Sequence, residues 1–342
     1  MSVSYDAGRV VEGSGWIALH KNENHFISPT WAERALRASA NIRFDCYPDP
    51  FSATIREELA KLYGVDSSNI YVGNGSDGVL ADILALLRLR FERVNLPDVG
   101  YKVYDILAAR YNYGVRRYRS ILNEKDTGLL VGLSVIDSPN AITGATVPAS
   151  VYENIAGASA NFVIWDNCYG DFEDRRLQIP DDMSNMAIVR SFSKYYGLAG
   201  LRIGYCIGSP ELVSSLNQIK DVYNVNGVAQ AMAIQALTDA NEFEASAARM
   251  LQVRKHLQNL LSRYGFDVVE PHGNFIFTSH PKITGSSLQK HFEHFNVLVR
   301  RFGYPETENW LRITVPSEAH MERLAEAIQS SAAYAEWAQL SS

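Results

Sequence analysis

The sequence predicts an α/β fold in which a mostly parallel sheet is covered by helices and is followed by a smaller α+β lobe. Short apolar runs rich in β-branched residues alternate with helical stretches through the middle of the chain, as in parallel sheets with helical crossovers. The last third mixes short strands with helices instead. The 342 residues are 46% apolar and 20% charged, which is typical of a globular protein and sufficient for two domains.

The first elements expected are helices and a strand that precede a glycine-rich turn. Ser52 is expected to cap the second helix, because a serine hydroxyl suits an N-cap and Glu57 and Glu58 follow closely. The expected spans are helices at 31–39 and 54–63, a strand at 70–72, and an amphipathic helix at 78–90.

The rest of the chain is expected to supply the sheet and then the smaller lobe. The expected sheet strands are 129–136, 162–165, 186–189 and 203–207. One or two long helices are expected at 228–264. The expected elements of the smaller lobe are strands at 266–269, 274–278, 297–299 and 311–315, and a closing helix at 317–331.

Charge and composition exclude several classes of function. The net charge is −6 and the isoelectric point is near 5.8, whereas nucleic-acid binding relies on a basic surface. No apolar run reaches the roughly 20 residues that cross a bilayer, and residues 1–15 lack the pattern of a signal peptide. We therefore expect a cytoplasmic protein with no nucleic-acid or membrane partner. Cys46, Cys168 and Cys206 lack C-x-x-C spacing, so neither a disulfide framework nor a metal site is expected.

The strongest chemical signal lies between residues 190 and 205. A lysine amine that is nucleophilic near neutral pH needs burial or nearby cations, and Arg202 follows Lys194 by eight residues. The hydroxyls of Ser191 and Ser193, with the guanidinium of Arg202, would suit a phosphate. A lone lysine is more often a solvated surface group, so the assignment depends on the surrounding residues.

A glycine-rich turn allows two interpretations. Gly73, Gly75 and Gly78 satisfy G-x-G-x-x-G between a strand and a helix, and Asp98 lies about 20 residues further on, as in a dinucleotide site. Backbone N–H groups at a helix N-terminus attract a phosphate whichever cofactor carries it. If the turn bound a nicotinamide dinucleotide, Lys194 would have no role. The short glycine motif alone is therefore weak evidence for a dinucleotide site.

The segment around Lys194, Ser-Phe-Ser-Lys-x-x-Gly-Leu-Ala-Gly-Leu-Arg-Ile-Gly-Tyr, closely resembles the Schiff-base segment of class I/II pyridoxal-phosphate aminotransferases. Within them it is most similar to the histidinol-phosphate aminotransferase group, and the resemblance extends through most of the chain. It implies the aspartate-aminotransferase-like fold: a large domain at 40–240 with a mostly parallel seven-stranded sheet, and a small domain formed by 1–39 with 241–342. It also implies transfer of an amino group between a donor, glutamate, and a small oxo compound. Histidinol phosphate and imidazole acetol phosphate are the favoured pair.

The same resemblance implies how the chain holds pyridoxal 5′-phosphate. Lys194 would bind the cofactor as a Schiff base. Once displaced by the substrate, it would move a proton between the substrate's α-carbon and the cofactor's C4′. Asp166, which ends an apolar run, would keep the pyridine nitrogen protonated, although such a residue is as often a simple cap. Tyr169 would hydrogen-bond the cofactor's O3′, and Tyr101 would stack on the ring. The phosphate contacts expected are Gly75, Ser76, Asp77, Ser191, Ser193 and Arg202.

Substrate contacts and a partner subunit are also implied by resemblance. Tyr47 is similar to a tyrosine that reaches the cofactor phosphate of the neighbouring subunit, which implies a homodimer with shared active sites. Arg312 would bind the acidic group of the substrate. The substrate contacts expected are Tyr5, Asn22, Asn274, Arg300 and Arg312.

Two departures from the family pattern leave the reaction open. Ala141 stands where the family has an asparagine that bonds the cofactor's O3′, so either Asn140 takes over that contact or it is absent. Arg301 replaces a frequent acidic residue. The alternatives are a decarboxylase of a phosphorylated amino acid, an aminotransferase of specialised metabolism, and a binding module that retains the cofactor without turnover. A nicotinamide-dependent oxidoreductase is the more distant alternative.

Overall fold

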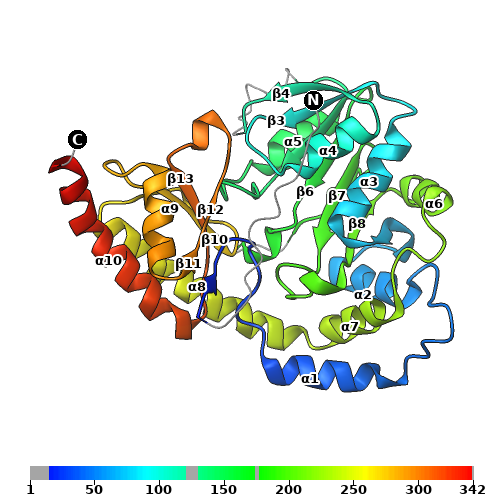
Figure 1. The fold of residues 1–342 in the computed structure, drawn as a ribbon. Helices are drawn as coiled ribbons and strands as arrows, with labels where there is room; N and C mark the ends of the chain where they lie inside the picture. The colour runs from blue at the N-terminus through cyan, green and yellow to red at the C-terminus, as the bar shows by residue number, and fades with distance from the viewer. Residues whose placement is uncertain (1–14, 121–129, 174–176, 341–342) are drawn as a thin grey trace.

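A seven-stranded sheet organises the first two thirds of the chain (Figure 1). Its strand order in a computed structural model, which describes residues 15–120, 130–173 and 177–340, is β2-β8-β7-β6-β5-β3-β4. Neighbours from β7 to β4 pair in parallel, and β8 runs antiparallel to both of its neighbours. The strands are β2 (Ile70–Gly73), β3 (Arg93–Pro97), β4 (Gly114–Tyr118), β5 (Leu133–Asp137), β6 (Phe162–Asp166), β7 (Met186–Ser191) and β8 (Gly204–Gly208). The predicted mostly parallel sheet is confirmed.

The central strands are buried on both faces because alternate side chains enter two different apolar clusters. In β5, Val135 packs into one cluster and Ile136 into the other, as the two-residue period of a strand requires. Helices cover both faces (Figure 1). Those packed on the Ile136 side are α1 (Pro29–Ala38), α2 (Ala53–Tyr63), α5 (Ala149–Ala156) and α7 (Gly227–Thr238). Those on the Val135 side are α3 (Gly75–Leu87), α4 (Val103–Arg110) and α6 (Pro210–Ile219).

The C-terminal third forms a separate apolar cluster with part of the N-terminal arm. The arm strand β1 (Ile17–Ala18) pairs in parallel with β11 (Val297–Leu298). An antiparallel sheet has the order β12 (Arg300–Arg301), β13 (Trp310–Thr314), β10 (Phe275–Ser279), β9 (Asp267–Val268). The helices of this region are α8 (Ala240–Arg263), α9 (Gly285–His294) and α10 (Glu318–Leu340). The division of the chain at residues 40 and 240 stays a prediction.

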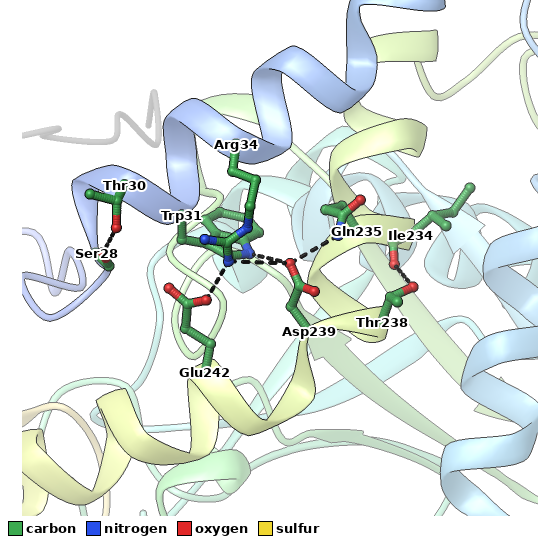
Figure 2. Close-up of polar contacts among 9 residues, drawn as sticks. All are labelled: Ser28, Thr30, Trp31, Arg34, Ile234, Gln235, Thr238, Asp239 and Glu242. Atoms are coloured by element: carbon green, nitrogen blue, oxygen red, sulfur yellow. Dashed lines mark hydrogen bonds and ion pairs between the residues drawn. The ribbon is translucent and has the colours of Figure 1, made fainter.

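Polar contacts join helix α1 to the junction between α7 and α8 (Figure 2). The indole N–H of Trp31 donates to Oδ2 of Asp239 at 2.9 Å, and the amide of Gln235 donates to the same oxygen. Arg34 and Glu242 form an ion pair of 2.5 Å beside it. Because Trp31 and Ala35 also enter the cluster under the main sheet, α1 packs with the sheet, whereas β1 packs with the C-terminal third.

Ser52 does not cap α2, which corrects one expectation. It precedes the helix, but its backbone is left-handed (φ 48°) and its side chain makes no capping bond. The carboxylate of Asp49 accepts the N–H groups of Phe51 and Ala53 instead. Asp49, four residues before Ala53, therefore caps the first N–H group of the helix.

Within the described ranges, no helix is both long enough and apolar enough to span a bilayer.

Candidate active site

A cavity of about 510 Å³ lies at the carboxyl ends of β6 and β7, and β12 and β13 of the C-terminal third close it. Ligands of open α/β sheets bind at this edge because the loops that follow parallel strands converge there. Eleven of the expected residues line the cavity: Ser76, Asp77, Tyr101, Asp166, Tyr169, Ser191, Ser193, Lys194, Arg202, Arg300 and Arg312.

A larger cavity of about 1,030 Å³ holds none of the expected residues. Its buried ions are Asp171 and Arg190, which pair with each other. Because these charges already satisfy one another, the smaller cavity is the better candidate for chemistry.

Lys194 lies in the loop after β7 and is half-buried. Its Nζ is 3.3 Å from the carbonyl of Lys21 and 3.4 Å from that of Asn22, and it lies 5.6 Å from the ring centre of Tyr169. The amide of Asn24 donates to the carbonyls of Lys194 and Tyr195 at 3.0 and 2.8 Å. The N-terminal arm therefore fixes the loop that presents the amine.

Asp166 ends β6 with its carboxylate in the cavity. Oδ2 accepts the hydroxyl of Tyr104 at 2.7 Å, and Oδ1 accepts the N–H of Cys168 at 3.2 Å. Burial raises the pKa of this carboxyl, and the two hydrogen bonds oppose that rise. Across the described part of the chain, Asp166 takes part in no ion pair. A cation in the cavity would complete its environment.

The other end of the cavity combines a helix N-terminus with a cation and hydroxyls. Helix α3 begins at Gly75, where φ is +73° and a Cβ would meet Nη2 of Arg202 at 2.7 Å. Arg202 pairs with Asp77 at 2.8 Å. Oγ of Ser193 is buried and has no hydrogen-bond partner in the described structure. Free N–H groups, a guanidinium and an unused hydroxyl together suit a phosphate.

Tyr169 connects the cavity to the N-terminal arm. Its hydroxyl accepts the amide of Asn22 at 2.9 Å, and burial raises the pKa of this phenol to about 12. Asn22 has a left-handed backbone (φ 54°), and its carbonyl accepts the amide of Asn274 at 3.1 Å. Asn22 and Asn274 thus orient Tyr169 from behind the cavity.

The opposite wall carries guanidinium groups. Arg312 donates to the carbonyls of Ala141 at 2.6 Å and His20 at 3.1 Å, which hold its plane. Its charge lies 5.0 Å from the ring centre of Phe302. Arg300 and Arg301 line the same wall. This concentration of positive charge in a chain of net charge −6 favours an anionic substrate.

Two further expected residues, Asn140 and Tyr47, do not line the cavity. The amide of Asn140 donates to the carbonyl of Val99 at 2.9 Å and its oxygen accepts two N–H groups of its own turn, so the side chain is used inside the loop and does not line the cavity. Tyr47 is 80% exposed and stacks on Tyr223 with ring centres 4.4 Å apart. Tyr5 lies outside the described residues.

Several residues that bear on the chemistry of the cavity were missed from the sequence. Lys21 and Lys102 line it, Tyr104 binds Asp166, and Asp137 ends the strand next to Asp166. The signal for Asp137 was present, because 133–137 and 162–166 are both apolar runs that end in aspartate.

The topology excludes the nicotinamide interpretation of the glycine turn. In dinucleotide folds, the strand before that turn lies inside a parallel sheet. Here β2 is an edge strand, and its neighbour β8 runs antiparallel. Oδ1 of Asp98 accepts the N–H groups of Val99 and of Ser120, which follows the neighbouring strand β4.

Comparisons with known proteins agree on one family. Residues 14–328 match the model of the family described as aminotransferase class I and II. A relative called histidinol-phosphate aminotransferase from Geobacter sp. (strain M21) is 32% identical over 321 residues, which cover 92% of each chain.

Two solved structures share the fold at low sequence identity. The histidinol-phosphate aminotransferase of Sinorhizobium meliloti, solved with pyridoxal 5′-phosphate, superposes with a TM-score of 0.82 at 22% identity and covers 92% of this chain and 90% of its own. A double mutant of Thermus thermophilus aspartate aminotransferase gives a TM-score of 0.79 at 18% identity and covers 93% and 91%.

Proposed function

Because the chain belongs to the class I and II aminotransferases and has the aspartate-aminotransferase-like fold, we propose that it exchanges an amino group between glutamate and imidazole acetol phosphate, with histidinol phosphate as the partner amine. The enzyme is a transaminase. The choice of substrate must be argued from the residues that line the cavity.

The cofactor is pyridoxal 5′-phosphate, and the cavity fits its groups. Ser193 offers an unused buried hydroxyl beside the N-terminus of α3 and Arg202, which suits the phosphate. Asp166 offers a buried carboxylate without a cation, which suits the protonated ring nitrogen. When bound, the cofactor supplies an aldehyde that reacts with amines and a ring that withdraws electrons from the substrate's α-carbon.

Each remaining residue has a role that its position allows. Lys194 would hold the cofactor covalently and, once released by the substrate, would move a proton between the substrate's α-carbon and the cofactor's C4′. Asp166 keeps the ring nitrogen protonated, and Tyr169 donates to the cofactor's O3′. Tyr101 covers the ring face. The phosphate contacts are Gly75, Ser76, Asp77, Ser191, Ser193 and Arg202.

The substrate assignment is supported by the guanidinium groups and by the names of the relatives. Arg312 binds the carboxylate of glutamate or the phosphate of the other substrate, because its fork matches both anions. Arg300 and Arg301 add charge on the same wall. Asn22 and Asn274 act through Tyr169. Tyr5 stays a predicted contact.

The observation that carries this proposal is the meeting of Lys194, Asp166 and Arg312 from three distant segments at one cavity. A half-reaction screen tests it. Purified protein loaded with pyridoxal 5′-phosphate is mixed with glutamate, histidinol phosphate or other amino donors while the visible absorbance is followed. Conversion to the pyridoxamine form with glutamate and with histidinol phosphate is expected. Conversion with neither donor would contradict the substrate assignment.

The same screen separates the alternatives. Release of carbon dioxide from a phosphorylated amino acid would identify a decarboxylase, and conversion with a different donor would identify another aminotransferase. Cofactor uptake without turnover would identify a binding module. The cytoplasmic location stays a prediction.

A homodimer with shared active sites is part of the proposal. Exposed apolar side chains gather on α1 and on two loops of the large sheet region: Leu36, Phe44, Tyr47, Phe51, Val222 and Tyr223. Exposed groups of this kind favour association with a partner. Tyr47 does not line the cavity of its own chain, which agrees with a contact to the cofactor phosphate of the partner subunit.

A further inference from the structure

Two buried carboxylates end adjacent strands beneath the cavity. Asp137 is the last residue of β5, Asp166 is the last residue of β6, and the two are register partners in a parallel pair. Register partners project from the same face of a sheet, so the carboxyl groups are neighbours. Asp137 is 3% exposed and Asp166 is 5% exposed.

The two carboxyl groups differ in their hydrogen bonds. Both oxygens of Asp166 accept hydrogen bonds, from Tyr104 and from the N–H of Cys168. Oδ1 of Asp137 accepts the N–H of Ala141 at 3.1 Å, and the N–H of Tyr101 and the hydroxyl of Tyr104 also act on this carboxyl and lower its pKa. Oδ2 is nevertheless buried and accepts no hydrogen bond of its own in the described structure. An ionised Asp137 would therefore leave a charged oxygen without a donor, which is costly in a buried site.

Among the residues that the structure describes, no cation pairs with Asp137. The titratable side chains that sense its charge are Asp166 and four phenols, Tyr104, Tyr118, Tyr169 and Tyr304. Burial raises the pKa of each phenol, so all four are neutral near pH 7. No ion pair of the described residues includes Asp137 or Asp166.

We propose that Asp137 is a positioning residue that retains a proton beside Asp166, so that the pair carries one negative charge, on the carboxylate that lines the cavity. Like charges this close do not both ionise readily, and the proton stays on the carboxyl group with fewer donors. Burial, followed by the charge of Asp166, raises the pKa of Asp137 well above its usual range. The inference rests on the proposed function in one respect, that Asp166 faces the ring nitrogen of the cofactor.

A retained proton makes the hold on the cofactor depend on pH. When the pH exceeds the raised pKa of Asp137, a second negative charge appears next to Asp166 and strengthens the attraction for a protonated ring nitrogen. Asp137→Asn has the same shape but no proton to lose. The affinity of the wild type relative to that of the variant should therefore rise with pH, by on the order of tenfold or more for a unit charge at this range.

The first test is infrared difference spectroscopy of the full chain, with and without pyridoxal 5′-phosphate. At neutral pH the C=O stretch of a protonated carboxyl group should be present in the wild type and lost in Asp137→Asn. The matched control is Asp105→Asn, since the buried Asp105 carboxylate pairs with Lys102 and Arg117 and should not contribute to that band. An unchanged protonated-carboxyl band in Asp137→Asn would overturn the proposal. Should that variant fail to fold, Asp137→Ser gives the same comparison.

The second test measures dissociation constants for pyridoxal 5′-phosphate from neutral to alkaline pH. A ratio of variant to wild-type constants that rises with pH supports the proposal. A ratio that is constant over a pH range in which the wild type loses its protonated-carboxyl band indicates a purely structural role and overturns it. A chain that bound no pyridoxal 5′-phosphate would contradict the proposed function, whereas the infrared comparison would still decide whether Asp137 carries a proton.

Discussion

The hydroxyl of Tyr104 donates a 2.7 Å hydrogen bond to Oδ2 of Asp166, and both groups are buried. Tyr104 lies on α4 and Asp166 ends β6, so the helix after β3 supports the carboxylate that we assign to the cofactor's ring nitrogen. This contact lowers the pKa of Asp166 against the effect of burial.

Removal of the Tyr104 hydroxyl should weaken cofactor binding and activity first at low pH. In Tyr104→Phe the pKa of Asp166 rises, because a bond to its charged form is lost, and the acid limb of kcat/KM moves to higher pH. Cofactor affinity should fall roughly tenfold, the value of a hydrogen bond to a charged group. The control is Tyr113→Phe, which removes a buried hydroxyl bonded to the carbonyl of Leu84. A Tyr104→Phe profile that matches the wild type would contradict the role.

Asp137→Asn should change the pH dependence of stability. An acid whose pKa is raised on folding contributes stability that is fully present below its unfolded value, near pH 4, and is lost as pH rises towards its folded value. The variant lacks this loss. The free energy of unfolding of Asp137→Asn should therefore increase relative to that of the wild type, by up to about 1.4 kcal/mol per pH unit above pH ~4. Urea unfolding across a pH series measures the difference, and parallel curves would count against a raised pKa.

Arg312→Lys should impair substrate binding without disturbing the cofactor. Lysine keeps the charge but cannot form the guanidinium fork, so kcat/KM for glutamate should fall roughly 30- to 100-fold, or about 2–3 kcal/mol. The absorbance of the bound cofactor should stay unchanged. Arg56→Lys is the control, because this guanidinium also donates to backbone carbonyls but lies away from the cavity. Equal losses in both variants would argue against a substrate contact.

Subunit mixing tests the shared active site. Tyr47→Ala and Lys194→Ala should each be nearly inactive, and a mixed dimer should contain one complete site. Random mixing makes half of the dimers mixed, so about one quarter of the wild-type activity should return. The control mixes Tyr223→Ala with Tyr47→Ala, because Tyr223 stacks on Tyr47 and both lie on the same surface. Activity that does not return in the first mixture, although mixed dimers form, would contradict sharing.

The sequence predicted several buried strands of the main sheet and missed others, among them the largely buried β3. Strands 162–165, 186–189 and 203–207 correspond to β6, β7 and β8 within two residues at each end. The β4 strand was missed because four of its five residues are exposed, so no apolar run marks it. The short helices α4 and α5 span only eight residues each, too few for a clear helical period.

In the site too, residues that stand in contiguous motifs were predicted, whereas contacts that depend on the tertiary fold were not. Lys194, Asp166 and Arg202 stand in contiguous motifs, and the structure brings them to one cavity. The pairing of Asp137 with Asp166 depends on which strands are neighbours, a property that no local pattern carries. The contact of Tyr104 with Asp166 joins residues 62 positions apart, so no local pattern indicates it.

Reduction with borohydride followed by peptide mass analysis tests the central claim most directly. The account predicts that pyridoxal 5′-phosphate becomes permanently attached to Lys194 in the wild type and that no adduct forms in Lys194→Ala. Lys21→Ala is the matched control, since Lys21 also lines the cavity, and it should keep the adduct on Lys194. An adduct on another lysine, or an undiminished adduct in Lys194→Ala, would contradict the site described for this chain.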